Sequence, residues 1–150
     1  MKVGNMKHLI VLLSAAVFAL AAQNCNAQEA VNYKTAYQRA QAGDKPLLVL
    51  VTAEWCPPCQ DMKRTTIPAL MQKSAFKNFH YATVDYDRDG KVARQLIGDR
   101  GVPQLIMYEK REGKWVRRYL SGYKTAQTVE AFVAQANTVR TASAVTTVDK

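Results

Sequence analysis

The stretch LLVLVTAEWCPPC, residues 47–59, places two cysteines and two prolines directly after an apolar run. The almost continuous apolar character of residues 46–53 is typical of a strand that is buried on both faces. Pro57 and Pro58 fit the first turn of a helix, where their missing N–H groups would have no intrahelical partner anyway. The stretch therefore predicts a buried strand that passes directly into a helix, with Cys56 and Cys59 at the start of that helix.

That position suits thiol chemistry. Unpaired N–H groups and the positive end of the helix dipole stabilise negative charge, so Cys56 should ionise more easily than a free cysteine. The thiolate is the nucleophile in disulfide exchange, and a cysteine one helical turn further on can attack a mixed disulfide formed at the first. Reaction sites in open α/β sheets lie at such strand ends. The spacing of Cys56 and Cys59 thus predicts thiol–disulfide exchange.

Two other uses of the cysteine pair remain open at this point. A structural disulfide is possible, although a bridge that closes so short a loop contributes little stability. A zinc site is also possible, but a closed structural site takes four ligands. Beyond the two cysteines, only His80 and surface carboxylates are present to complete it.

The rest of the chain alternates helical and strand patterns. Apolar residues at helical spacing predict four helices, at residues 31–42, 61–74, 91–97 and 125–139. Four strands are predicted at residues 46–53, 79–85, 104–108 and 115–120, the last two joined as a hairpin through Glu112-Gly113. Pro68 lies within the second helical pattern and predicts a kink or a break there. We expect an α/β fold in which a mixed sheet of about four strands carries helices on both faces.

Three separate features together resemble the thioredoxin family. They are VLVTAEWCPPC at residues 49–59, Gly101-Val102-Pro103 at the opening of the third strand, and Gly122 after the last strand. The resemblance covers residues 31–137. The segment KPLLVLVTAEWCPPCQDMKRTTIP, residues 45–68, is most similar to exported thioredoxin-like domains related to the C-terminal domain of the membrane disulfide reductase DsbD. The resemblance implies the thioredoxin fold.

The resemblance also implies roles for individual residues. Cys56 would be the attacking cysteine and Cys59 the resolving one. Pro103 would follow a cis peptide bond and face the cysteines, since cis bonds are essentially confined to X-Pro. The backbone of Val102 would pair with the extended peptide of a substrate. The implied substrate surface consists of Trp55, Pro57, Val102, Pro103 and the loop near Gly122, and neither a cofactor nor a metal is implied.

The chain departs from the family at one position that matters for proton transfer. Many thioredoxins have a buried aspartate six residues before the first cysteine, and this chain has Leu50 there. Glu54 is the carboxylate nearest to the cysteines in sequence, and strand alternation places it on the same face as Leu50. We therefore predict that Glu54 relays a proton through water, with an exposed acid beside Trp55 as the alternative.

The first 27 residues have the layout of a secretory signal peptide. Two lysines precede an apolar stretch at residues 9–22, which ends in small residues and is followed by Cys25-Asn26-Ala27. That stretch is about 14 residues long, whereas spanning a bilayer takes roughly 20, so we expect cleavage rather than a membrane anchor. A lipid attached to Cys25 is the alternative. We expect no stable membrane span in the mature chain, one thioredoxin-like domain at residues 28–140 and a flexible tail at residues 141–150.

The charge of the chain gives little information about its partners. The net charge is +9, or +7 without the two lysines of the leader. Basic residues are interspersed with acidic ones, which indicates a solvated surface rather than a docking patch. No nucleic-acid-binding motif is present, so we expect no nucleic-acid partner.

These patterns predict an exported thiol–disulfide oxidoreductase, with the periplasm as the expected compartment and secretion or lipid anchoring as alternatives. Its expected partners are disulfide-containing exported proteins and a membrane or soluble electron donor. Pro57 and Pro58 bring no charge that would favour a strongly oxidising thiolate, which favours a reductant. The competing hypothesis is a non-catalytic binding module or a copper carrier, for which His80 would have to supply a further ligand.

Overall fold

The computed structural model describes residues 32–43 and 45–145 and contains a four-stranded sheet in the order β2-β1-β3-β4. β1 pairs with β2 in parallel and with β3 antiparallel, and β3 and β4 form an antiparallel hairpin. The elements in chain order are α2 (Tyr33–Ala42), β1 (Leu47–Thr52), α3 (Pro57–Asp61), the π-helical turn η1 (Met62–Thr66), α4 (Ile67–Gln72), β2 (His80–Asp85), α5 (Gly90–Ile97), β3 (Gln104–Arg111), β4 (Lys114–Ser121) and α6 (Ala126–Val145). The predicted thioredoxin fold is confirmed.

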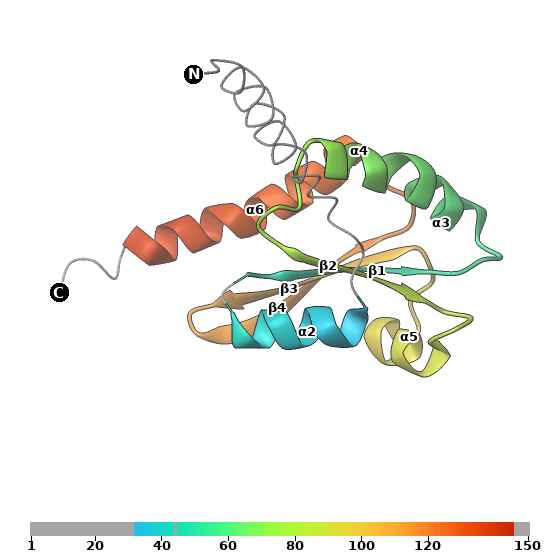
Figure 1. The fold of residues 1–150 in the computed structure, drawn as a ribbon, viewed down its shortest axis with the longest axis horizontal. Coiled ribbons are helices and arrows are strands. Elements are labelled where there is room, and N and C mark those ends of the chain that lie inside the picture. Colours follow the sequence, from blue (N-terminus) through green and yellow to red (C-terminus); the bar gives the residue numbers. More distant parts are fainter. Residues whose placement is uncertain (1–31, 44, 146–150) are drawn as a thin grey trace, which may run out of the picture.

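Helices cover both faces of the sheet, with α2 and α5 on one side and α3, α4 and α6 on the other (Figure 1). The fully buried β1 alternates between two apolar clusters. Leu48 and Leu50 pack with Met62 and residues of α4 and α6, whereas Val49 and Val51 pack with residues of α2 and α5. Burying each of these aliphatic side chains contributes about 1.5–3 kcal/mol. The sandwiched strand therefore gives the cysteines that follow it a rigid support.

The helix after the cysteines is interrupted, as the sequence predicts. The chain passes from α3 through the π-helical turn η1 into α4 without leaving the helical path, and Pro68 occupies the first turn of α4. Proline cannot donate the hydrogen bond that would reach back to the carbonyl of Arg64. A π-helical turn is one way in which a helix accommodates such an irregularity. The interruption therefore lies just before Pro68.

Helix α6 continues to Val145, into the stretch that the sequence assigns to a tail. Residues 146–150 lie outside the described residues, as do residues 1–31, which contain the predicted signal peptide and Cys25. Over the described part of the chain, none of the helices has the length and apolar character needed to cross a membrane.

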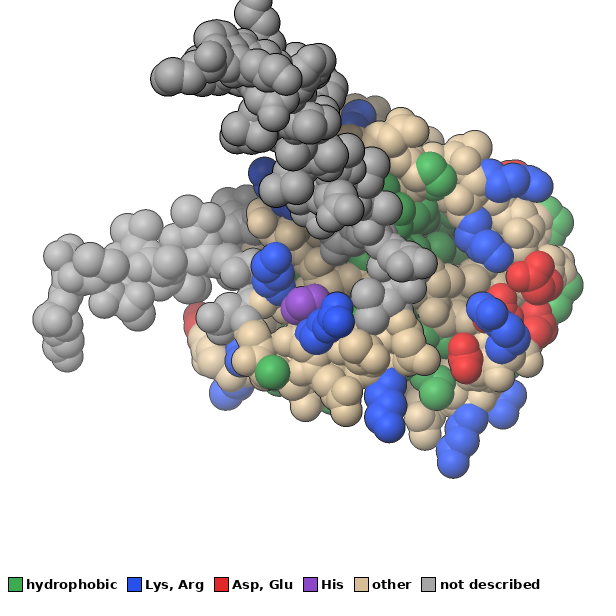
Figure 2. Space-filling model, viewed as in Figure 1, with side chains coloured by type: hydrophobic (Ala, Val, Ile, Leu, Met, Phe, Trp, Pro, Cys, Tyr) green, Lys and Arg blue, Asp and Glu red, His purple; other side chains and the backbone are tan. Residues whose placement is uncertain are grey.

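Charged side chains are unevenly distributed on the face seen in Figure 2. Lys and Arg side chains are scattered over it, and Asp and Glu side chains gather at the end of the molecule where β1 passes into α3 in Figure 1. Acidic residues in this region include Glu54, Asp87 and Asp89, which are all exposed. This acidic end is also the end that carries the cysteines.

Candidate active site

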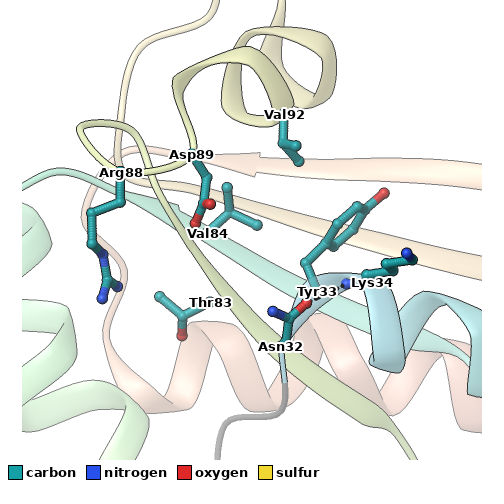
Figure 3. Close-up of a pocket in the computed structure, with 8 residues that line it drawn as sticks. All are labelled: Asn32, Tyr33, Lys34, Thr83, Val84, Arg88, Asp89 and Val92. Carbon is teal, nitrogen blue, oxygen red and sulfur yellow. Dashed lines mark hydrogen bonds between the residues drawn. The ribbon is translucent and has the colours of Figure 1, made fainter.

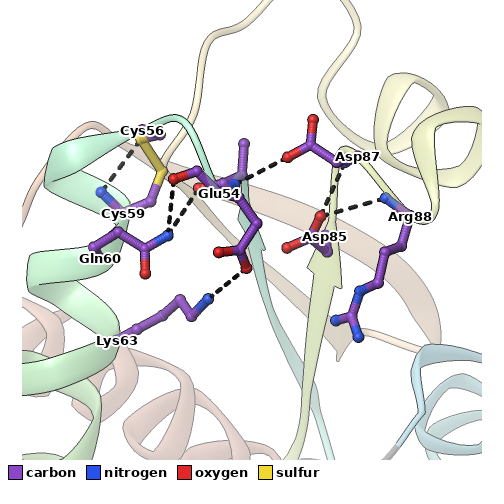
Figure 4. A network of polar contacts seen from close by, with 9 residues as sticks. Glu54, Cys56, Cys59, Gln60, Lys63, Asp85, Asp87 and Arg88 are labelled. Atoms are coloured by element: carbon purple, nitrogen blue, oxygen red, sulfur yellow. Dashed lines mark hydrogen bonds and ion pairs between the residues drawn. A yellow bond between two sulfur atoms is a disulfide. The ribbon is translucent and has the colours of Figure 1, made fainter.

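Cys56 and Cys59 form a disulfide just beyond the carboxyl end of β1 (Figure 4). Their Cα atoms lie 5.3 Å apart. Cys56 is the N-cap residue of α3, and Cys59 lies within that helix. Cys56 retains 4% of its surface exposed and Cys59 retains none, so only Cys56 presents any surface to an incoming molecule.

The first turn of α3 directs backbone donors at Cys56. The N–H of Cys59 donates to Cys56 Sγ across 3.2 Å, and the carbonyl of Cys56 accepts from the N–H groups of Cys59 and Gln60. Pro57 and Pro58, both exposed, occupy the first helical positions, as their fixed φ favours. An N–H group aimed at sulfur together with the helix dipole stabilises a thiolate. The geometry therefore places the more nucleophilic sulfur at Cys56.

The segment before β3 closes one side of the cysteine pair. The Val102–Pro103 peptide bond is cis, as the resemblance to the thioredoxin family implies. The side chain of Val102 packs on the cluster formed by Ala53, Cys56 and Cys59. Pro103 is buried, and its carbonyl accepts from the N–H of Gly122 at 2.8 Å. Among the described residues, nothing is hydrogen-bonded to the backbone of Val102, so its N–H and C=O are available to an extended peptide.

Trp55 is held on the surface by an acid from the neighbouring strand end. The ring is 66% exposed, and its Nε1 donates to Asp87 Oδ1 at 3.0 Å. The other oxygen of Asp87 accepts from the N–H of Glu54, also at 3.0 Å. Tyr86 lies edge-on to the Trp55 ring and packs against the cysteine cluster. Asp87 therefore fixes both the backbone and the aromatic side chain that precede Cys56.

Sequence reasoning missed Asp87, although the chain contained a signal for it. The carboxyl ends of parallel strands meet at one edge of a sheet, so acids that directly follow β2 must lie near the end of β1. Asp85, the last residue of β2, is almost completely buried, and its Oδ1 accepts from the N–H groups of Asp87 and Arg88 at 2.9 and 3.3 Å (Figure 4). Asp85 thus shapes the turn that presents Asp87.

Glu54 lies at the surface beside the cysteines. Its side chain is 70% exposed, and Oε1 is 3.4 Å from Lys63 Nζ. The amide of Gln60 donates to the carbonyls of Ala53 and Glu54, which ties α3 to the end of β1. Leu50 is completely buried in the core below. An apolar residue therefore fills the core position six residues before Cys56. The relay through Glu54 stays a prediction.

The comparisons with known proteins agree with this geometry. Residues 27–110 match a family model described as thioredoxin-like. The chain belongs to the thioredoxin-like family. A curated relative, thioredoxin Asp f 29 from Aspergillus fumigatus, is 27% identical over 84 residues, which are 56% of this chain and 74% of the relative.

Solved thioredoxin structures share the fold of this thioredoxin-like chain. A thioredoxin from Thermus thermophilus superimposes with a TM-score of 0.59 at 23% identity, over 69% of this chain and 82% of its own. Chloroplastic thioredoxin z superimposes with a TM-score of 0.60 at 19% identity, over 73% of this chain and 94% of its own. The protein Trxlp from Edwardsiella tarda superimposes with a TM-score of 0.53 at 30% identity, over 66% of this chain and 91% of its own. The cysteine pair of this thioredoxin-like chain is consistent with thiol–disulfide oxidoreductase chemistry.

His80, the histidine within the described residues, does not join the cysteines. His80 begins β2 opposite Leu47, at the end of β1 remote from Cys56. Burial lowers the pKa of His80, and the nearby cations Lys45 and Arg39 lower it further. Within the described ranges, no three His, Cys, Asp or Glu residues are grouped closely enough to hold a metal ion. Neither the zinc alternative nor the copper alternative finds its further ligand at His80.

A separate hollow of about 540 Å³ wraps around the edge of β2, away from the cysteines (Figure 3). Thr83 and Val84 contribute from opposite faces of the strand, since successive strand residues alternate. The other residues that line it are Asn32, Tyr33, Lys34, Arg88, Asp89 and Val92. Neither cysteine of the disulfide lines this hollow, and neither does His80.

Proposed function

We propose that this chain is an exported protein-disulfide oxidoreductase that reduces disulfides in other exported proteins. The observation that carries the proposal is the Cys56–Cys59 pair at the start of α3, with a backbone N–H directed at Cys56 Sγ. The exposed ring of Trp55 and the available backbone of Val102 support a peptide substrate. Pro57, which is exposed between the cysteines, belongs to the proposed substrate surface, and Pro103 is its buried neighbour directly after Val102.

In the proposed reaction, the Cys56 thiolate attacks one sulfur of a substrate disulfide. A Cys56–substrate S–S bond forms as the substrate bond breaks, and the departing substrate sulfur takes up a proton. Cys59 then loses its proton and attacks Cys56 Sγ, which releases the second substrate thiol. The cycle leaves a Cys56–Cys59 disulfide and a substrate that has gained two electrons and two protons. A membrane or soluble electron donor must then reduce that disulfide again.

Glu54 is the proposed relay for the proton of Cys59, acting through water. Its support is its place two residues before Cys56 and the presence of Leu50 where many thioredoxins have an acid. Its Oε1 also lies 3.4 Å from Nζ of Lys63.

The reducing direction is supported by the residues between the cysteines. Strong oxidants of this fold are oxidising because their reduced form, with its thiolate, is stabilised. Pro57 and Pro58 supply no charge or side-chain donor that would stabilise the thiolate in this way. We expect a reduction potential close to that of thioredoxin, which is about −270 mV. A potential close to that of the strong oxidant DsbA, about −120 mV, would contradict the proposed direction.

Insulin reduction tests the chemistry itself. Wild-type protein with dithiothreitol as the electron donor should accelerate insulin reduction, and Cys56→Ser should fall to the uncatalysed rate. Cys59→Ser should accumulate a mixed disulfide with the substrate, because its attacking cysteine remains. Equal rates for wild type and Cys56→Ser would instead support a binding module.

Export is proposed because residues 1–27 have the layout of a signal peptide, and the periplasm is the proposed compartment. The similarity of residues 45–68 to domains related to the C-terminal domain of DsbD supports the same compartment. Fractionation of cells that express the full chain, with N-terminal sequencing of the product, tests this step. The expected mature chain begins at Gln28 after a cut behind Ala27, or earlier after a cut within residues 19–22. A product that retains residue 1 in the cytoplasm would exclude export.

A further inference from the structure

A hollow of about 460 Å³ opens beside α5. It is lined by Tyr86, Arg94, Arg100 and the turn at residues 97–99. Tyr86 also packs on the cluster that contains Cys56 and Cys59, so one side chain borders both the hollow and the cysteine site. Tyr86 therefore links the hollow to the cysteine site.

The two arginines of the hollow have no acidic partner among the described residues. Arg94 and Arg100 are exposed, and neither takes part in an ion pair, whereas the exposed cations Arg64 and Lys73 do. Asp99 also lines the hollow and is exposed, so the hollow carries two positive charges and one negative charge. A carboxylate would meet a net positive charge there.

Arg100 is fixed in place before any ligand arrives. Its guanidinium lies 4.1 Å from the centre of the Tyr119 ring, and Nη1 donates to the carbonyl of Ile97 at 3.4 Å. A cation stacked on an aromatic ring keeps its remaining N–H donors free. Holding those donors in position reduces the entropy that binding would otherwise cost.

The residues around Trp55 carry the opposite charge to the arginines of the hollow. Glu54 and Asp87 flank Trp55, which lies edge-on to Tyr86, while Arg94 and Arg100 line the hollow that Tyr86 borders. Arg100 precedes Val102 by two residues, and an extended chain advances about 3.3 Å per residue. An acidic side chain two or three residues from a substrate cysteine would therefore reach the hollow when the substrate pairs with Val102.

We propose that this hollow, named here the arginine hollow, binds an acidic residue that flanks the target disulfide of a peptide substrate. The inference rests on the proposed function, because it defines the substrate class of the same site. The arginine hollow then selects substrates by charge, and the acidic flank at Glu54 and Asp87 sets the direction in which the peptide lies.

Peptide binding tests the arginine hollow without any redox chemistry. Two labelled peptides share one sequence with serine at both cysteine positions, and differ in having Glu or Gln two and three residues from the first serine. Fluorescence anisotropy at about 50 mM salt should show about fivefold tighter binding of the Glu peptide, the size expected for two exposed ion pairs. At about 500 mM salt the preference should largely disappear, because exposed charges are screened.

Variants assign the preference to the two arginines. Arg94→Gln with Arg100→Gln should bind both peptides equally, and Arg94→Lys with Arg100→Lys should recover part of the preference. Arg94→Gln alone should lose about half of it, which covers the case in which removing Arg100 from Tyr119 disturbs the fold. Arg39→Gln with Lys114→Gln is the matched control, because it removes two exposed cations elsewhere and should keep the preference.

The results separate the two proposals. Equal binding of both peptides by the wild type, or an unchanged preference in Arg94→Gln with Arg100→Gln, would overturn the arginine hollow. Reduction of the corresponding disulfide peptides is measured in parallel. A charge preference in binding without cysteine-dependent reduction would overturn the proposed function and leave the arginine hollow standing.

Discussion

Each end of the sheet buries a carboxylate, and the two carboxylates are held in different ways. Glu109 on β3 is 2% exposed, and its Oε1 forms ion pairs with Nη2 of Arg111 at 2.7 Å and with Nε of Arg118 at 2.9 Å. Asp85 at the end of β2 is 1% exposed, and its Oδ1 receives two backbone N–H groups of the turn that follows. The charge of Glu109 is compensated by arginines from its own hairpin, whereas Asp85 holds the turn that follows β2.

The difference separates stability from reactivity. Arg118 also donates to Gln135 and to the carbonyl of Phe132, so the Glu109 cluster fastens α6 to the sheet. The Asp85 turn instead presents Asp87, which holds Trp55 beside the cysteines. We infer that changes at Glu109 act on folding, whereas changes near Asp85 act on the cysteine site.

The largest expected effect is on the free energy of unfolding of Glu109→Ala. Removing one partner of a buried ion pair leaves the other charge without compensation, which costs about 3 kcal/mol. Arg111 and Arg118 are partly exposed, so the loss should stay near the lower end of the usual range. Denaturant unfolding of the oxidised protein measures it.

Glu130→Ala is the matched control for Glu109, since Glu130 forms an exposed ion pair with Lys73 and its loss should change stability by less than about 1 kcal/mol. Insulin reduction by folded Glu109→Ala should equal that of the wild type. A variant that is stable but slow would show that the Glu109 end also serves the reaction.

The next largest effect is expected for Asp87→Ala. The change removes two hydrogen bonds to a carboxylate, one from Trp55 and one from the backbone of Glu54, and should destabilise the protein by about 1.5 kcal/mol. The Trp55 ring should become more mobile, with a shift in its fluorescence, and insulin reduction should slow. Asp89→Ala is the control, because Asp89 makes no side-chain hydrogen bond at the cap of α5. Equal rates and spectra for both variants would refute a positioning role for Asp87.

The fold could be predicted further from the sequence than the site could. Each helix and strand was predictable because apolar periodicity reports burial, and the cis bond at Pro103 followed from a family resemblance. Asp87 was missed, because its hydrogen bond to Trp55 follows from the parallel pairing of β1 with β2 and not from any periodicity of the sequence. The Glu109 cluster was missed for a related reason: an acid within a predicted strand carries no sign that arginines from the same hairpin will surround it.

A smaller effect is expected for Glu54→Gln, because Glu54 is mostly exposed and water can replace it in part. If Glu54 relays the proton of Cys59, the variant should slow the resolving step a few-fold at neutral pH and alter its pH dependence. Rapid-mixing measurements of the exchange over a range of pH test this. Lys63→Met controls for the lost ion pair, since it removes the partner and keeps the carboxylate. An unchanged pH profile in Glu54→Gln would remove Glu54 from the mechanism.

The smallest effect is expected at His80, on the end of β1 remote from the cysteines. Burial, with Lys45 and Arg39 nearby, lowers the pKa of His80, so the folded state binds its proton less tightly than the unfolded state does. This contribution favours folding above the ordinary histidine pKa of about 6.5 and is lost as the pH falls through that value toward the lowered pKa. His80→Gln should therefore lose less thermal stability than the wild type between about pH 7.5 and pH 5.5, and insulin reduction by the two proteins at neutral pH should be equal. Parallel losses in both proteins would show that protonation of His80 does not oppose folding.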